Sequence, residues 1–154
     1  MILLSLAIFG ASGCSTFDQD WEAARHAPRT PRPAATAAEN LSGAWEGSWK
    51  SSANGHGGEL RGIFESMDEN RYEVRFHATF GGVFSFEYTV PIRVAREALG
   101  QGFEGQADLG PLAWGLYLYR GQIVGDEFTA RYDCGFDHGT FFMERRDAGL
   151  GSAP

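Results

Sequence analysis

Short segments in which apolar and polar residues alternate constrain this chain more than any other feature of its sequence. The clearest is 71–80, where apolar residues at even positions alternate with polar residues, most of them charged. Such alternation is typical of a β-strand with one buried face. Seven further segments show related patterns, each bounded by turn residues: 42–52, 59–66, 83–94, 102–108, 114–124, 127–133 and 140–146.

Eight consecutive strands with short connections predict an all-β fold. We expect an eight-stranded antiparallel up-and-down β-barrel, because closure removes the exposed edges of a sheet. A two-sheet β-sandwich is the alternative architecture. The 21 Gly, 12 Phe, 5 Tyr and 4 Trp of the 154-residue chain suit short strands and tight turns. Residues 95–101 are the exception, because A-R-E-A-L-G-Q predicts one or two helical turns.

Two resemblances support the barrel. Gly43-Ala44-Trp45 and Arg145 resemble the lipocalin, or calycin, pattern. In that pattern a G-x-W tryptophan near the closed end of the barrel packs under an arginine from the last strand. The chain also resembles small bacterial envelope proteins that carry W-E-G-x-W near the start and D-H-G-x-F near the end of the domain. The first resemblance implies a calycin-like barrel, and the second implies no particular activity.

The N-terminal residues predict a targeting signal. Residues 1–13 contain no charged side chain and end in Ala11-Ser12-Gly13 before Cys14. An apolar stretch of about ten residues suits a secretory signal better than a membrane span, which needs about 20. The segment resembles the lipobox of bacterial lipoproteins, which implies that Cys14 is diacylated in the mature protein. The alternatives are plain secretion, with an unmodified Cys14, and a buried N-terminal strand.

The remaining segments divide the chain into a tether, a domain and a tail. Pro28, Pro31 and Pro33 indicate that 14–39 is a disordered linker behind the lipidated cysteine. Trp21 within it could dock on the domain or enter the lipid headgroups. We expect the folded domain at 40–147 and a disordered tail at 148–154.

The resemblance to lipoproteins also implies a location. Ser15 follows the cysteine, and no aspartate is present there to retain a lipoprotein at the inner membrane. We therefore expect a cell-envelope protein anchored in the outer membrane, facing the periplasm or the cell surface. A net charge of −7 disfavours nucleic acid as a partner.

The inward face of the expected barrel is rich in aromatic side chains. An eight-stranded barrel either fills with its own side chains or holds one small ligand. If the barrel is hollow, we expect an apolar or amphiphilic small molecule inside it, with tyrosine hydroxyls and an arginine as polar contacts. The predicted ligand-binding residues are Trp45, Trp49, Phe76, Phe84, Phe86, Tyr88, Phe128, Tyr132 and Arg145.

One end of the barrel should also gather polar residues. The loops that contain His56 and Asp137-His138 lie at the same end of an up-and-down barrel, and His77 lies on a strand that ends there. Imidazole and carboxylate groups can hold a metal ion or exchange protons near neutral pH. Residues of these types are also ordinary turn formers, so we predict no metal and no cofactor.

The leading hypothesis is a lipid-anchored, non-enzymatic barrel that binds a small molecule. The first alternative is a solid barrel that acts as a protein-interaction or inhibitor module, with Trp114 and Phe142 as contacts. The second is an enzyme or metal site at the His56, Asp137 and His138 rim. The sequence contains no G-x-S-x-G, H-E-x-x-H or phosphate-loop motif.

Overall fold

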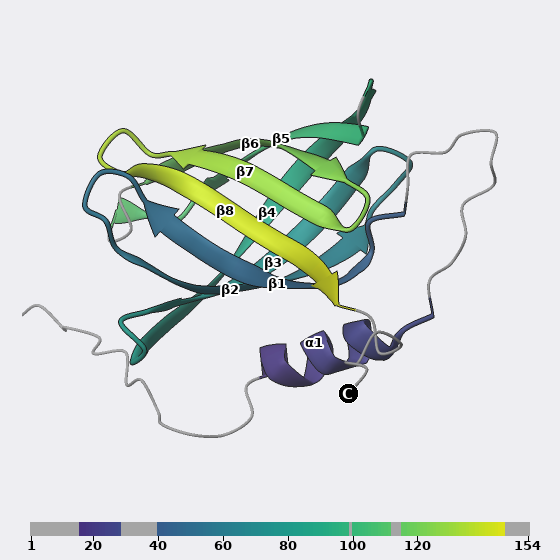
Figure 1. The fold of residues 1–154 in the computed structure, drawn as a ribbon, viewed down its shortest axis with the longest axis horizontal. Coiled ribbons are helices and arrows are strands. Elements are labelled where there is room, and N and C mark those ends of the chain that lie inside the picture. Colours follow the sequence, from purple (N-terminus) through teal and green to yellow (C-terminus); the bar gives the residue numbers. More distant parts are fainter. Residues whose placement is uncertain (1–15, 29–39, 99, 112–114, 147–154) are drawn as a thin grey trace, which may run out of the picture.

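A closed eight-stranded barrel forms the body of the protein (Figure 1). The computed structural model describes residues 16–28, 40–98, 100–111 and 115–146. Each strand pairs antiparallel with the next one in sequence, and the last strand pairs with the first. The elements are α1 (Thr16–His26), β1 (Gly43–Ser51), β2 (Gly57–Ser66), β3 (Arg71–Phe80), β4 (Phe84–Glu97), β5 (Gly100–Asp108), β6 (Leu116–Val124), β7 (Glu127–Asp133) and β8 (His138–Arg146).

The expected barrel is thus confirmed and the sandwich is not formed. Alternation gives each strand an inner and an outer face. On β3, Tyr72, Val74, Phe76 and Ala78 point inward and are buried, whereas Glu73 between them is exposed. The same pattern holds around the barrel, so the periodicity of the sequence correctly predicts the lining of the core.

A tryptophan and an arginine seal one end of the barrel. The guanidinium of Arg145 lies 4.9 Å from the ring centre of Trp45. Arg145 Nη2 also donates a hydrogen bond to the carbonyl of Asn40, at 2.6 Å. Trp45 Nε1 donates to the carbonyl of Leu41, at 3.0 Å. The chain segment before β1 is thereby held across this end, which we call the closed end.

Helix α1 corrects the expected linker at residues 16–26. Phe17 and Trp21 lie one turn apart and pack against Ala44 and Ile63 on the outer faces of β1 and β2. The indole of Trp21 donates to the carbonyl of Trp45, at 3.2 Å. The helix forms because these outward apolar side chains of the barrel provide a surface for its apolar stripe. Trp21 therefore docks on the domain.

Two ion pairs fix the helix on the barrel. Asp18 pairs with Arg61 of β2, at 2.7 Å, and Asp20 pairs with Arg75 of β3, at 2.5 Å. No helix in the described part of the chain is long and apolar enough to cross a membrane. Residues 1–15, 29–39 and 147–154 lie outside the described residues, and with them the predicted signal, Cys14 and the predicted tail.

The helical turns expected at residues 95–101 are absent from the described residues. Strand β4 continues to Glu97, and its pairing with β5 runs from Ile92 opposite Gly105 to Glu97 opposite Gly100. Val90, Ile92 and Val94 extend the inward alternation through this region. Backbone pairing with β5 therefore outweighs the favourable helix propensity of the Ala and Glu residues in this short segment.

Candidate functional site

The end of the barrel opposite Trp45 and Arg145 contains an apolar cavity of about 560 Å³. We call it the open end; it is formed by the loops β1–β2, β3–β4, β5–β6 and β7–β8, on the left in Figure 1. Nine of its fourteen lining residues are aromatic. The lining residues are Trp49, Asn54, His56, Ala78, Phe80, Phe84, Phe86, Tyr88, Leu109, Tyr117, Tyr119, Tyr132, Asp137 and Phe141.

The β3–β4 hairpin forms one wall of the cavity. Gly81 and Gly82 turn the chain with φ angles of +61° and +72°, a conformation that glycine adopts readily. The hairpin projects from the barrel (Figure 1). Phe84 and Phe86 are in phase with the inward residues of β4, yet they are 68% and 46% exposed. Because the hairpin carries them beyond the core, these two phenylalanines form part of the rim of the cavity.

Aromatic packing closes the floor of the cavity. Phe76 lies among the buried core residues, with ring centres 5.4 Å from Tyr88 and 5.7 Å from Phe141. Towards the closed end, Phe128 stacks on Phe103 at 4.7 Å and meets Phe64 at 5.5 Å. The barrel is therefore filled in its closed half and hollow in its open half.

Four tyrosine hydroxyl groups lie in this hollow half. Burial raises the pKa of Tyr88, Tyr117, Tyr119 and Tyr132 above the usual value for tyrosine. Interactions with neighbouring polar groups make smaller contributions, among them Tyr119 beside Tyr88 and Cys134 beside Tyr117. The hydroxyl groups therefore stay protonated at neutral pH and offer polar contacts in an otherwise apolar space.

One carboxylate lines the cavity. Asp137 Oδ1 accepts a hydrogen bond from Ser51 Oγ, at 2.5 Å, and Oδ2 accepts one from Tyr132, at 3.2 Å. Its backbone N–H donates to the sulfur of Cys134, at 3.3 Å. These contacts from β1, β7 and its own loop hold the Asp137 side chain at the edge of the cavity.

The structure brings together only part of the predicted polar rim. His56 and Asp137 both line the cavity, and the His56 ring packs against Phe80 at 4.9 Å. The neighbouring loops are joined by a bond from Ser52 N to the carbonyl of His138, at 2.7 Å. The side chain of His138 is exposed and does not line the cavity.

The expectation that His77 joins this rim is wrong. Its side chain faces outward, where its ring stacks on Phe17 of α1 at 5.1 Å. Burial beneath the helix lowers the pKa of His77, and the nearby Arg61 lowers it further. Within the described ranges, no group of three or more His, Cys, Asp or Glu side chains is arranged to hold a metal ion.

The predicted ligand-binding residues divide between the two halves of the barrel. Five of them line the cavity: Trp49, Phe84, Phe86, Tyr88 and Tyr132. The other four lie outside it and are corrected here: Phe76, Trp45, Phe128 and Arg145. Arg145 points inward as expected, but it stands at the far end of β8, where it covers Trp45 and cannot serve as a polar contact in the cavity.

Sequence reasoning missed Phe80, Tyr117, Tyr119 and Phe141 among the lining residues. Tyr117 and Tyr119 lie in a segment that is apolar on both faces, so alternation alone did not indicate which set points inward. Leu116 and Leu118 prove to be the exposed set, each 49% exposed. Trp114, which is in this segment, lies outside the described residues.

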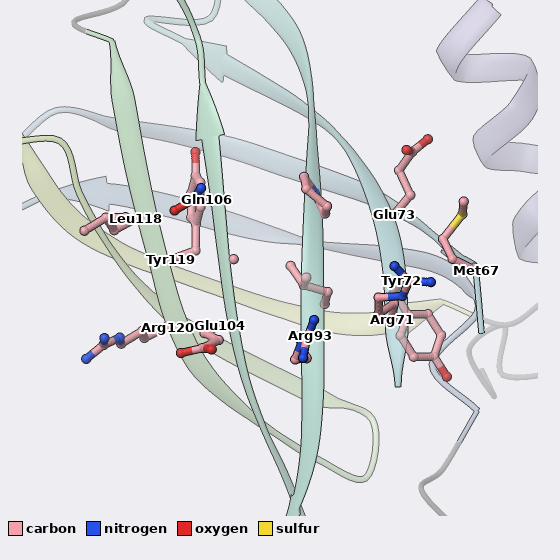
Figure 2. Close-up of a pocket in the computed structure, with 13 residues that line it drawn as sticks. Met67, Arg71, Tyr72, Glu73, Arg93, Glu104, Gln106, Leu118, Tyr119 and Arg120 are labelled. Carbon is pink, nitrogen blue, oxygen red and sulfur yellow. The ribbon is translucent and has the colours of Figure 1, made fainter. Parts of the chain in front are cut away.

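A second hollow, of about 610 Å³, lies on the outer face of β3–β6. Its wall is charged, in contrast to the cavity inside the barrel. Figure 2 shows Arg93, Glu104 and Arg120 on three neighbouring strands. Glu104 stands opposite Arg93 in one strand pair and opposite Arg120 in the other. Leu118 and Gln106 complete the outer surface beside them.

Comparison with known proteins supports the fold. A de novo designed fluorescence-activating β-barrel is similar in structure, with a TM-score of 0.50 and 20% sequence identity. The match covers 71% of this chain and 97% of the designed one. At this identity, the similarity concerns the fold alone. No protein-family model and no curated protein matches the sequence. The protein is a small, closed, eight-stranded antiparallel β-barrel.

Proposed function

We propose that this barrel binds one apolar or amphiphilic small molecule in the cavity at its open end and catalyses no reaction. The observation that carries the proposal is the cavity itself, of about 560 Å³ and lined mainly by aromatic side chains. Ligand sites are typically concave, mostly apolar and furnished with a few polar groups. The tyrosine hydroxyls and Asp137 are the polar groups in this cavity.

The architecture supports the same proposal. Eight-stranded barrels are wide enough either to be filled by side chains or to hold one small ligand. In this chain the large aromatic residues Trp45, Phe64, Phe103 and Phe128 fill the closed half. The designed barrel of the same fold is described as fluorescence-activating.

The proposal includes a location in the cell envelope, with the barrel anchored through lipid on Cys14. Its support is the apolar segment 1–13 and the small residues before the cysteine. Two acyl chains would anchor the protein stably, whereas one would not. Replacing Cys14 with alanine should move the protein out of the membrane fraction. Retention of the Cys14→Ala protein in the membranes would contradict the anchor.

A cavity-filling variant tests the ligand directly. The full chain is purified from bacterial membranes in polymer nanodiscs, and small molecules are extracted under denaturing conditions and identified by mass spectrometry. Ala78 lines the cavity and is buried, so Ala78→Phe should occupy the space and displace the molecule. Ala98→Phe, in an exposed turn, is the matched control. A molecule that copurifies equally with all three proteins, or with none, would contradict the proposal.

A second candidate function is a protein-interaction or inhibitor module. The observation in its favour is the group of apolar side chains exposed on the outer faces of β6 and β8: Leu116, Leu118, Val124 and Phe142. This candidate predicts a tight protein partner whose binding is weakened by Phe142→Ser and unaffected by Ala78→Phe. The third candidate, an enzyme or metal site, has less support because the His138 side chain is exposed and does not line the cavity with His56 and Asp137.

A further inference from the structure

We infer that the cavity selects ligands with a positively charged group, such as an alkylammonium or an aromatic cation, over ligands that carry a carboxylate or a sulfate. This inference rests on the proposed function and specifies the chemical class of its ligand. Three properties of the lining lead to it: aromatic walls, one carboxylate, and a lining without lysine or arginine.

The walls favour a cation. The faces of Trp, Tyr and Phe rings carry negative electrostatic potential and attract cations within about 6 Å. Trp49, Tyr88, Tyr117 and Tyr132 all line the cavity. Tyr117 lies with its ring centre 6.0 Å from that of Tyr132. Aromatic side chains from β1, β4, β6 and β7 thus surround one space, as in sites that recognise quaternary ammonium groups.

Asp137 supplies a negative charge that the structure does not neutralise. Its two hydrogen-bond donors, Ser51 and Tyr132, are neutral hydroxyl groups. Each carboxylate oxygen can accept a further interaction. Among the described residues, no lysine, arginine or histidine forms an ion pair with Asp137. A cation in the cavity would therefore gain a charged partner in a largely apolar environment, where such attraction is stronger than in water.

No lysine or arginine lines the cavity, and several of the basic residues are held away from it. Arg145 covers Trp45 at the closed end, and Arg61 and Arg75 pair with helix α1. Arg93 and Arg120 lie on the outer face (Figure 2). A fatty acid or an alkyl sulfate in the cavity would meet Asp137 without a compensating positive charge. The arrangement of charge therefore disfavours anionic ligands even though the walls suit their apolar parts.

Three probes that share one phenyl group and differ in charge test this selection: benzyltrimethylammonium, benzyl alcohol and benzoate. Binding to the full chain is followed by NMR from the indole N–H of Trp49, which lines the cavity and donates to Thr79 at 2.8 Å. The titrations with all three probes are run at the same pH. We expect benzyltrimethylammonium to bind about tenfold more tightly than benzoate.

A pair of charge-matched variants separates the local effect of Asp137 from the net charge of −7. Asp137→Asn keeps an acceptor for Ser51 but removes the negative charge, and it should lower the preference for benzyltrimethylammonium over benzyl alcohol about fivefold. Asp133→Asn removes one charge from an exposed position at the same hairpin and should leave that preference within about twofold. Retained binding of benzyl alcohol shows that each variant is folded.

The outcomes distinguish this inference from the function on which it rests. If benzyl alcohol binds and benzoate binds as well as the cation, the cavity is a ligand site and the inference of cation selection is wrong. Equal loss of preference in Asp137→Asn and Asp133→Asn would also overturn it. If none of the three probes shifts the Trp49 signal, the proposed small-molecule function itself is contradicted.

Discussion

The closed and open halves of this barrel are built from the same strands and the same kinds of residue, yet one is solid and the other is hollow. At the closed end, Trp45 is fully buried under Arg145 and packs against Phe64 and Phe128. At the open end, Phe84 and Phe86 stand on a projecting hairpin and leave space between them and the core. The closed half provides stability, which allows the open half to remain unfilled.

The largest effect is expected from the centre of the closed half. Trp45→Ala removes a fully buried ring and its hydrogen bond to Leu41. We expect the free energy of unfolding to fall by about 3–5 kcal/mol, measured by chemical denaturation. Trp49→Ala, in the wall of the cavity, should lower the free energy of unfolding by clearly less. Equal losses of stability in the two variants would contradict the distinction between a solid closed half and a hollow open half.

Helix α1 should contribute to stability from outside the barrel. Trp21→Ala removes a buried indole and its bond to the carbonyl of Trp45, and we expect a loss of about 3 kcal/mol. Glu22→Ala, at an exposed position on the same helix, is the control and should cost less than about 0.5 kcal/mol. A loss no larger than that of the control would show that the helix is not docked in solution.

The buried tyrosines predict a loss of stability in alkali. The pKa of Tyr88 and of Tyr119 is raised in the folded protein, mainly by burial. Above pH 10 the unfolded chain therefore releases protons that the folded protein keeps. Stability is complete below pH 10 and falls by about 2 kcal/mol between pH 10 and pH 11 for these two groups. Tyr117 and Tyr132, whose pKa values are also raised, add to the measured loss. Tyr119→Phe should therefore reduce the total loss by about 1 kcal/mol in denaturation curves at the two pH values; an unchanged loss would contradict the account.

The smallest effect on stability is expected at the rim of the cavity. Phe86 is 46% exposed, so Phe86→Ala should cost less than about 1 kcal/mol. The same change removes part of the wall and should weaken benzyl alcohol binding about threefold or more. Leu118→Ala is the matched control, because Leu118 is 49% exposed on the outer face. It should leave the affinity unchanged, and a similar loss of affinity in both variants would contradict the assigned wall.

The sequence predicted the strands and the inner face better than it predicted the cavity. Alternation marks which residues point inward, and it placed Tyr72, Phe76 and Phe128 correctly. It does not report how far along the barrel axis each residue lies. That position depends on the pairing of neighbouring strands and on the projection of the β3–β4 hairpin. Arg145 and Tyr132 both point inward, for example, but they lie at opposite ends of the barrel.

Helix α1 and residues 95–101 were predicted wrongly for a common reason. Each is a short segment that cannot hold its structure by local preference alone, and in each a tertiary partner decides the structure. The outer surface at Ala44 and Ile63 stabilises the helix at Phe17 and Trp21, within a segment whose later prolines indicated a linker. Pairing with β5 extends β4 to Glu97. Neither partner can be identified from the local sequence alone.

The most direct test of the two-ended barrel compares two indole groups in one titration. Benzyl alcohol is added to the full chain while the indole N–H signals of Trp49 and Trp45 are followed by NMR. Trp49 lines the cavity, and Trp45 is sealed beneath Arg145. We predict a saturable shift of the Trp49 signal and no shift of the Trp45 signal. An unmoved Trp49 signal, or equal shifts of both, would contradict the account of a ligand-binding open end above a solid closed end.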